Sequence, residues 1–307
     1  WQLTLSETDR FFERLTTQTK IQPNIKIEIP ILEKIRLGPS EEESQLIGPY
    51  LEWARMIAQV TAQMHGTLST LYHADFTPEE PTPFYLRSNF QSKRNLVYQT
   101  CQRLLALLPK SSPKLQQLIS QFLEKKEYII QTFEPILHPL ENFLRIRCHG
   151  DYHLGQLLFV GQEIKIFNFS KGANRSFSER KRRRSALRDV AGMIRSFHFA
   201  IFTSFIHQEQ KGLMKLDPSS ANHAWPTFWQ SWVAGTFIKE YRNSVKEAPF
   251  IPHELNNFII SLQAYLLETA IEDLSEELHK PHSVWLEISL GWALAIIEQY
   301  PKIALSP

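Results

Sequence analysis

The sequence predicts a mostly α-helical protein that carries one small β-hairpin unit near its middle. Long stretches on both sides repeat apolar residues at the three- and four-residue spacing of amphipathic helices. Between them, residues 143–170 alternate apolar and polar side chains over short runs, as strands do. Glycine is scarce, with 11 residues in 307, and neither a GxGxxG nor a Walker-type GxxxxGK motif occurs. A glycine-rich loop that wraps phosphates is therefore not encoded.

In the first part of the chain, the pattern predicts a helix over residues 6–18, opened by the capping sequence Ser6-Glu7-Thr8-Asp9. Residues 23–40 contain three of the 18 prolines and alternate apolar residues, which predicts an extended linker. A long amphipathic helix is expected over residues 41–69, and the proline-containing stretch 77–82 breaks it. The residues expected on the buried faces are Phe11, Phe12, Leu15, Leu46, Leu51, Ala54, Ile57, Ala58, Thr61, Met64 and Leu68.

Further helices are expected before and after the central unit. Two precede it, over residues 84–109 and 112–138, and the second is opened by Ser111-Ser112-Pro113. A basic loop at 172–185 follows the unit. The helical pattern then returns over residues 187–207, 225–246, 252–279 and 283–299.

The central unit consists of three short runs with the pattern of strands. They cover residues 143–148, 156–160 and 163–169, and Gly161-Gln162 forms the tight turn between the last two. Catalytic and binding residues are often carried by loops that a rigid scaffold positions. The sequence therefore places the candidate site in residues 148–170.

The loop of this unit carries a combination of residues suited to phosphoryl transfer. It begins with His149-Gly150-Asp151 and continues to Gln156. In that chemistry one Asp orients and deprotonates the attacking hydroxyl, a nearby amide helps to hold Mg²⁺, and a second Asp binds Mg²⁺ against the nucleotide phosphates. Asp151 and Gln156 suit the first two roles at their spacing. The position of the second carboxylate is occupied by Asn168.

Two segments resemble the signature sequences of the maltokinase family. They are RIRCHGDYHLGQLL, residues 145–158, and SALRDVAGMIRSFHFA, residues 185–200. Further family-like stretches, which extend the resemblance over essentially the whole chain, lie at residues 83–88 and 91–96 and in the C-terminal part from residue 229 through 268. Maltokinases have an aminoglycoside-phosphotransferase-like, protein-kinase-like fold and are often fused to trehalose synthase. The resemblance implies transfer of the γ-phosphate of ATP to maltose, which gives maltose 1-phosphate in trehalose and glycogen metabolism.

The resemblance assigns roles residue by residue. It implies that Asp151 is the catalytic base, that His149, Gln156 and Asn168 lie at the Mg-ATP site, and that Gln156 and Asn168 are the metal ligands. Asn168 replaces an Asp of the family pattern, so this chain lacks the negative charge that attracts Mg²⁺. The two acidic residues that follow in the family are Ser170 and Gly172 here, with Lys171 between them.

The C-terminal helix also departs from the family pattern. A Lys and two aromatic positions, expected near the sugar, are here Thr269, Glu272 and Glu276. The resemblance further implies that residues 1–307 form a single C-terminal kinase lobe without the N-terminal ATP lobe. Within that lobe, residues 1–142 are expected to be helical, residues 143–170 to form the catalytic-loop and hairpin unit, and residues 171–307 to be helical again.

Two classes of function stay open. One is a sugar kinase weakened at its metal site, which acts on maltose or a related disaccharide. The other is a non-catalytic docking or sugar-sensing module attached to a trehalose synthase. The basic run Arg180–Arg184 suggests nucleic acid, but no aromatic residues are interleaved with it, so nucleic-acid binding is not expected.

Composition adds some limits. The net charge of +2 favours no class of partner. The sequence contains no run of about 18 apolar residues, so no membrane span is predicted. The two cysteines, Cys101 and Cys148, exclude a disulfide scaffold and favour a cytoplasmic setting. His65 and the tryptophans at helical spacing are expected in the core, and Asp189 is expected to support the catalytic loop.

Overall fold

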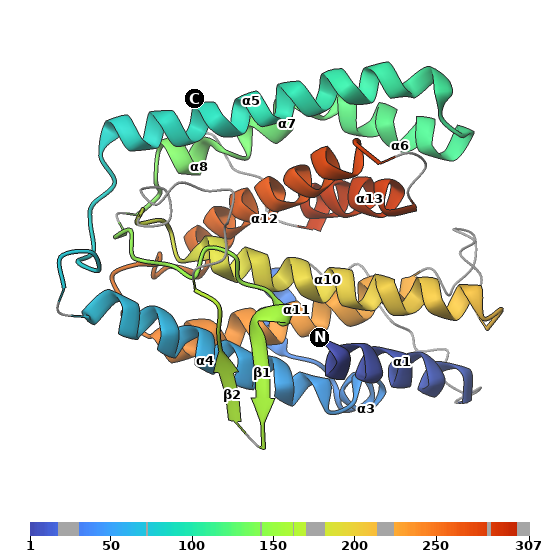
Figure 1. Cartoon of the computed structure of the whole chain (residues 1–307), viewed down its shortest axis with the longest axis horizontal. Coiled ribbons are helices and arrows are strands. Elements are labelled where there is room, and N and C mark those ends of the chain that lie inside the picture. Colours follow the sequence, from blue (N-terminus) through green and yellow to red (C-terminus); the bar gives the residue numbers. More distant parts are fainter. Residues whose placement is uncertain are drawn as a thin grey trace. The chain divides into compact units, whose positions relative to one another are not determined.

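The computed structural model describes residues 1–17, 31–71, 73–141, 143–161, 163–169, 182–213, 224–280 and 284–299. In this part of the chain the protein is mostly helical, with one two-stranded antiparallel sheet (Figure 1). No helix among these residues is both long enough and apolar enough to cross a membrane. The chain divides into two compact units. The first comprises Trp1–Thr77, Ile146–Arg183 and Gly192–Ala248, and the second Pro78–Arg145, Arg184–Ala191 and Pro249–Pro307.

Helices and the β-hairpin together build the first unit. Its helices are α1 (Gln2–Thr17), α2 (Ile31–Leu37), α3 (Glu41–Ile47), α4 (Tyr50–Thr70), the part of α10 (Leu187–Gln210) from Gly192 on, and α11 (Trp225–Val245). The core lies where α11 packs on α4 and α2, and α11 is buried on all sides over Ser231–Ile238. Inside it, the buried His65 lies 2.8 Å from the hydroxyl of Tyr241. His65, Trp229 and Trp232 are core residues, as the sequence predicted, whereas Trp53 and Trp225, covered by the same prediction, are only partly buried.

Glycine and proline set the boundaries of the N-terminal helices. The predicted 41–69 helix is interrupted at Gly48, whose φ of 77° is outside the range of a helix, and Pro49 then starts α4. Helix α3 begins with a capping box between Ser40 and Glu43. The extended linker predicted over residues 23–40 was wrong for Ile31–Leu37, which is helix α2, and residues 18–30 lie outside the described residues.

The hairpin of the first unit consists of β1 (Leu157–Val160) and β2 (Glu163–Ile166), close to the two strands predicted. Gly161 has the positive φ of 61° that the tight turn requires, while Gln162 lies outside the described residues. Phe159 packs on Trp53 of α4, with 4.5 Å between ring centroids. The strand predicted over residues 143–148 was wrong: Arg145 makes only an isolated bridge with Glu79, in the second unit.

The second unit is built from helices alone in its described part. They are α5 (Pro83–Leu107), the 3₁₀ turn η1 (Leu108–Lys110), α6 (Pro113–Glu124), α7 (Lys126–Gln131), α8 (Glu134–Leu137), the first residues of α10, α12 (Leu255–Glu277) and α13 (Val284–Gln299). The helix predicted over residues 112–138 is therefore three shorter helices. They break at Lys125 and before Pro135, which takes the first turn of α8. Helices α12 and α13 lie side by side, and α5 packs on α12 (Figure 1).

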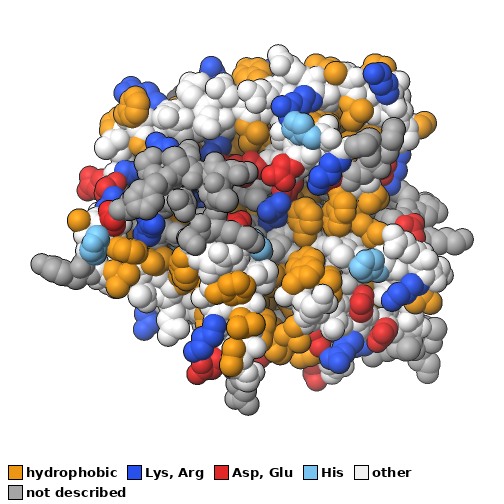
Figure 2. Space-filling model, viewed as in Figure 1, with side chains coloured by type: hydrophobic (Ala, Val, Ile, Leu, Met, Phe, Trp, Pro, Cys, Tyr) orange, Lys and Arg blue, Asp and Glu red, His pale blue; other side chains and the backbone are white. Residues whose placement is uncertain are grey.

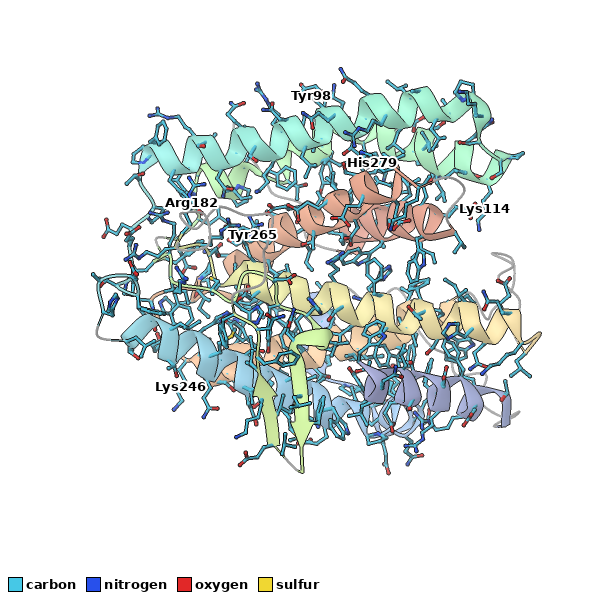
Figure 3. All side chains as sticks on the ribbon, in the orientation of Figure 1. Tyr98, Lys114, Arg182, Lys246, Tyr265 and His279 are labelled. Carbon is cyan, nitrogen blue, oxygen red and sulfur yellow. The ribbon has the colours of Figure 1, made fainter. Side chains whose placement is uncertain are left out.

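A buried ionic cluster joins three helices of the second unit. Glu268 of α12 accepts from Lys93 of α5 and, at 2.9 Å, from Arg188 of α10. Tyr265, labelled on α12 in Figure 3, lies one turn before Glu268 and is also buried. For Glu268, burial raises the pKa, but the two cations outweigh this and hold the pKa below its usual value. The cluster compensates charges that the apolar core would otherwise exclude.

Candidate active site

The loop that begins at Ile146 in the first unit is shaped by one glycine and one histidine. Gly150 has φ 84°, a conformation that suits glycine and turns the chain sharply before Asp151. The buried His149 accepts at Nδ1 from the N–H of Asp151, at 3.4 Å. Its Nε2 therefore carries the hydrogen and donates to the carbonyl of Phe167, at 3.0 Å. His149 is thus a hydrogen-bonding residue that ties the loop to the end of the hairpin.

Gln156 closes the loop and lies beneath Asp151. It ends a short 3₁₀ turn, in which its N–H donates to the carbonyl of His153 at 2.8 Å. Its side chain is 1% exposed, and the amide nitrogen lies 3.4 Å from Oδ2 of Asp151 and 3.1 Å from Nε2 of His153. The other amide atom, Oε1, is buried and has no hydrogen-bond partner in the described part of the chain. A buried acceptor without a donor is costly, and such a group calls for a functional explanation.

Asn168 follows the hairpin directly and has a left-handed backbone with φ 68°. Among residues other than glycine, Asn and Asp adopt this conformation most readily. Its neighbour Phe167 is bonded to the loop at both backbone groups, because its N–H donates to the carbonyl of Gln156 at 3.1 Å and its carbonyl accepts from His149. Asn168 is thereby held next to the loop, while Ser170, Lys171 and Gly172 lie outside the described residues.

The loop rests on α10 and α4 through residues to which the sequence alone assigned no role. A Cβ on Gly192 would lie 2.6 Å from the carbonyl oxygen of Tyr152, so only glycine lets α10 approach this closely. Ser196 accepts from the N–H of Leu154 at 3.1 Å, and the Tyr152 hydroxyl lies 2.8 Å from that of Thr61. Gly192 and Ser196 belong to the family-like segment 185–200, and that resemblance was the feature of the sequence that could have indicated their contact with the loop. Asp189, one turn earlier, is buried.

The site is poor in negative charge. Within the described residues, no group of three or more His, Cys, Asp or Glu side chains is placed to hold a metal ion. Asp151 is half-exposed, and Nε2 of His153 lies 3.8 Å from its carboxylate. The structure thus brings together His149, Asp151, Gln156 and the backbone that carries Asn168.

Large apolar side chains remain exposed on the hairpin and just after it. They are Leu158, Val160, Phe167 and Phe169. Hydrophobic side chains are seen gathered over this part of the first unit in Figure 2. Exposed apolar residues that occur singly need no explanation, but a group of them beside a polar loop is typical of a binding surface.

Comparison with solved structures shows where this fold occurs. A glucosamine kinase matches with a TM-score of 0.63 and 14% sequence identity over 95% of this chain and 59% of its own. A glucosamine kinase in complex with glucosamine, ADP and inorganic phosphate matches with a TM-score of 0.60 and 16% identity over 85% of this chain and 56% of its own. No protein-family model matches the chain.

These likenesses establish the fold. The chain shares the fold of part of these glucosamine kinases and spans less than two thirds of their length. This supports the expectation of a kinase-like fold at the level of sugar kinases.

The basic run is described only from Arg182, labelled in Figure 3, because Arg180 and Lys181 lie outside the described residues.

Proposed function

We propose that this chain carries the catalytic loop of an ATP-dependent sugar kinase whose metal site has lost a carboxylate. The observation that supports this best is the pair formed by Asp151 and Gln156. A buried amide is fixed beside the carboxylate, and its oxygen has no donor within the described residues. A cation is the partner that such an oxygen lacks. Gln156 Oε1 and the Asn168 amide are oxygen donors, the kind that Mg²⁺ prefers, so the residues fit the ion although they carry little charge.

In the proposed reaction, Asp151 accepts the proton of a sugar hydroxyl while that oxygen forms a bond to the γ-phosphorus of ATP; the bond from this phosphorus to the bridging oxygen breaks, and ADP leaves. Mg-ATP, when bound, supplies the phosphoryl group and the cation that neutralises its charge. His149 hydrogen-bonds to the backbone of both Asp151 and Phe167, so it fixes the base relative to the segment that carries Asn168. Gln156 would hold the metal ion through Oε1. The remaining parts of the nucleotide site are proposed to come from an ATP-binding lobe like that of related kinases.

The apolar surface on the hairpin supports a nucleotide. Leu158 and Val160 present exposed apolar side chains on one face of β1, and Phe167 lies just past the end of β2. A nucleobase has a flat apolar face that packs well on such a surface. We assign this surface to the base of ATP. Replacing Leu158 by Asp should weaken nucleotide binding while leaving the buried core intact, because Leu158 is exposed.

The neutral residue at position 168 sets the expected rate. An amide supplies an oxygen but no charge, and the missing charge is worth several kcal/mol of transition-state stabilisation, or roughly 10²–10⁴ in rate. We therefore propose a slow kinase. For the acceptor, the maltokinase resemblance indicates maltose, and the solved structures are of kinases for glucosamine. Both are sugars with several hydroxyl groups, and an assay must include each of them.

The test is a phosphoryl-transfer assay on the whole protein that contains this chain, with Mg-ATP and either maltose or glucosamine. We expect slow formation of a sugar phosphate, its loss in Asp151→Asn, and a gain of about 10²-fold or more in Asn168→Asp. Asn95→Asp, which adds the same charge at an exposed position, is the matched control and should change nothing. Turnover that survives Asp151→Asn would refute the assignment of the base.

A second candidate function rests on Asn168 itself. Loss of the metal carboxylate is also what a non-catalytic module would show, one that docks on a trehalose synthase or senses a sugar. The two candidates differ in their response to Asn168→Asp. If neither the native protein nor this variant binds Mg-ATP or transfers phosphate, while the protein co-purifies with a trehalose synthase, the docking function replaces the kinase.

A further inference from the structure

The first unit contains a polar cavity away from the catalytic loop. It lies among α2, α3, α4 and α11 and has a volume of about 290 Å³. Since a water molecule takes roughly 30 Å³ of liquid, the space corresponds to about ten water molecules. The lining residues are Lys34, Gly38, Pro39, Ser44, Arg55, Gly235, Thr236, Lys239, Glu240 and Asn243. None of them belongs to the proposed kinase site, so a ligand in this cavity is independent of the kinase proposal.

Charged side chains of both signs lie in and around the cavity. Arg55 pairs with Glu52 at 2.7 Å, and Glu240 accepts a hydrogen bond from Gln59 at 2.8 Å. The two lysines, Lys34 and Lys239, have no carboxylate within ion-pair distance in the described part of the chain. Among the lining cations of the described residues, Arg55 is paired with Glu52 and Lys34 is attracted by Glu43, which leaves Lys239 with no carboxylate close to it. A cation that lines a concave site attracts anions.

Lys34 is an unusual cation because it is 3% exposed. Its ammonium donates to the hydroxyl of Ser231 and lies 5.3 Å from the ring centroid of Trp232. Neither partner carries a negative charge, and burial of an uncompensated cation is costly. Burial lowers the pKa of Lys34 to about 8, with Glu43 opposing the shift. A negative charge bound nearby would compensate this lysine.

Lys239 provides a cation at the open side. Its Nζ lies 3.9 Å from where a Cβ on Gly38 would be, beside the left-handed turn that ends α2. The helix that carries it runs on to Asn243 and ends before Lys246, labelled in Figure 3. No carboxylate is within reach in the part of the chain that the structure describes, so this ammonium is available to a ligand.

Hydroxyl and amide groups complete the lining. Thr236 is 8% exposed, and its hydroxyl makes no hydrogen bond within the described residues, although helical threonines commonly bond to the preceding turn. The side chains of Ser44 and Asn243 likewise make none there. These groups can donate to anionic oxygens and can exchange hydrogen bonds with alcohols. The cavity therefore combines cations with neutral polar groups.

From this geometry we propose that the cavity binds a phosphomonoester of a small polyol. The phosphate would be held by the positive charge of Lys239 and Lys34 and by the Thr236 hydroxyl. The hydroxyl groups of the polyol would be held by Ser44 and Asn243. The volume fits a molecule with about ten non-hydrogen atoms, at the lower end of ligand pockets. The site would make this unit responsive to a phosphorylated metabolite.

Calorimetric titration of the full chain with glycerol 3-phosphate tests the proposal, with glycerol and inorganic phosphate as partial ligands. We expect glycerol 3-phosphate to bind, inorganic phosphate to bind more weakly, and glycerol not to bind. Thr236→Val keeps the shape of the side chain and removes the hydroxyl, and it should raise Kd about tenfold. Lys239→Gln should raise Kd by roughly three- to tenfold and reduce its salt dependence.

Two further variants make the titration decisive. Lys110→Gln removes an exposed lysine of the second unit and should leave Kd unchanged, because Lys110 is not a lining residue. Asp151→Asn should also leave it unchanged. Absence of binding by wild-type protein overturns the proposal, and so does a Kd that neither Thr236→Val nor Lys239→Gln affects. Binding that Asp151→Asn alters would place the ligand at the catalytic loop and overturns it as well.

Discussion

Replacing Glu268 by glutamine is expected to destabilise the second unit by about 3–5 kcal/mol, the range for removal of one partner from a buried ion pair. The side chain of Glu268 is 4% exposed and that of Lys93 6%. One oxygen of Glu268 accepts from both Lys93 and Arg188. Glutamine keeps an oxygen at this point but removes the negative charge, so two cations would be left without compensation.

The pKa of Lys93 shows what the carboxylate does in this cluster. Burial lowers the pKa of Lys93, and the attraction of Glu268 only partly offsets the effect. Burial therefore disfavours the charged form of Lys93 even with its partner present, and removal of the carboxylate would take away the attraction that offsets this effect. Lys93→Met should cost much less, because the pair of Glu268 and Arg188 remains and an apolar chain of similar length replaces the lysine.

The assay is urea-induced unfolding at pH 7 followed by circular dichroism, with hydrogen exchange of α12 peptides to report on the second unit itself. Adding Lys93→Met to Glu268→Gln should recover part of the loss, since one of the two uncompensated cations is gone. A cost below 1 kcal/mol for Glu268→Gln would refute the reasoning. So would a larger cost for Lys93→Met than for Glu268→Gln.

Three further predictions concern the first unit. Gly192→Ala should destabilise the chain by about 1–3 kcal/mol and increase hydrogen exchange in the catalytic loop, because the new Cβ meets the carbonyl of Tyr152. Gly66→Ala, a helical position with open space, is the control and should instead stabilise by about 0.5–1 kcal/mol in urea unfolding. Burial, with help from Arg195, lowers the pKa of His198 from 6.5 to about 3. Between these values the unfolded chain binds more protons, so stability should fall with falling pH, by about 2 kcal/mol at pH 5 relative to His198→Gln. Burial lowers the pKa of Lys34 from 10.5 to about 8, so between these values the unfolded chain binds more protons and the free energy of unfolding should rise with pH. The rise should reach about 3 kcal/mol relative to Lys34→Met. Parallel curves of unfolding free energy against pH for the two proteins would contradict this.

Long helices with a periodic apolar pattern were predictable from the sequence. A short helix that lies between two prolines was not. The pattern over residues 187–207 and 252–279 gave helices close to α10 and α12, because many turns of one face agree. Helix α2 was missed because it is seven residues long and lies between prolines, which favour an extended conformation. Its helical spacing of Ile31, Lys34 and Ile35 places a lysine at a buried position, which a pattern of apolar residues does not reveal.

The candidate site was predictable where its residues are close in sequence. The spacing from His149 to Gln156 and the hairpin to Asn168 follow from local pattern, and the structure brings these residues together. Contacts between distant residues had no such signal. The cluster of Lys93, Arg188 and Glu268 depends on how three helices pack, and no motif in the sequence encodes it.

The backbone position of Asn168 at the proposed metal site does not depend on the charge of its side chain. Hydrogen bonds between neutral groups fix Phe167 on both sides, so the position of residue 168 does not rely on a carboxylate. Its φ of 68° is a conformation that Asn and Asp both accept, so an exchange between them leaves the backbone unstrained. An Asp at this position would consequently restore the charge without rebuilding the loop. Any change in Mg-ATP binding by Asn168→Asp therefore measures the charge alone, which is what the proposed loss of activity requires.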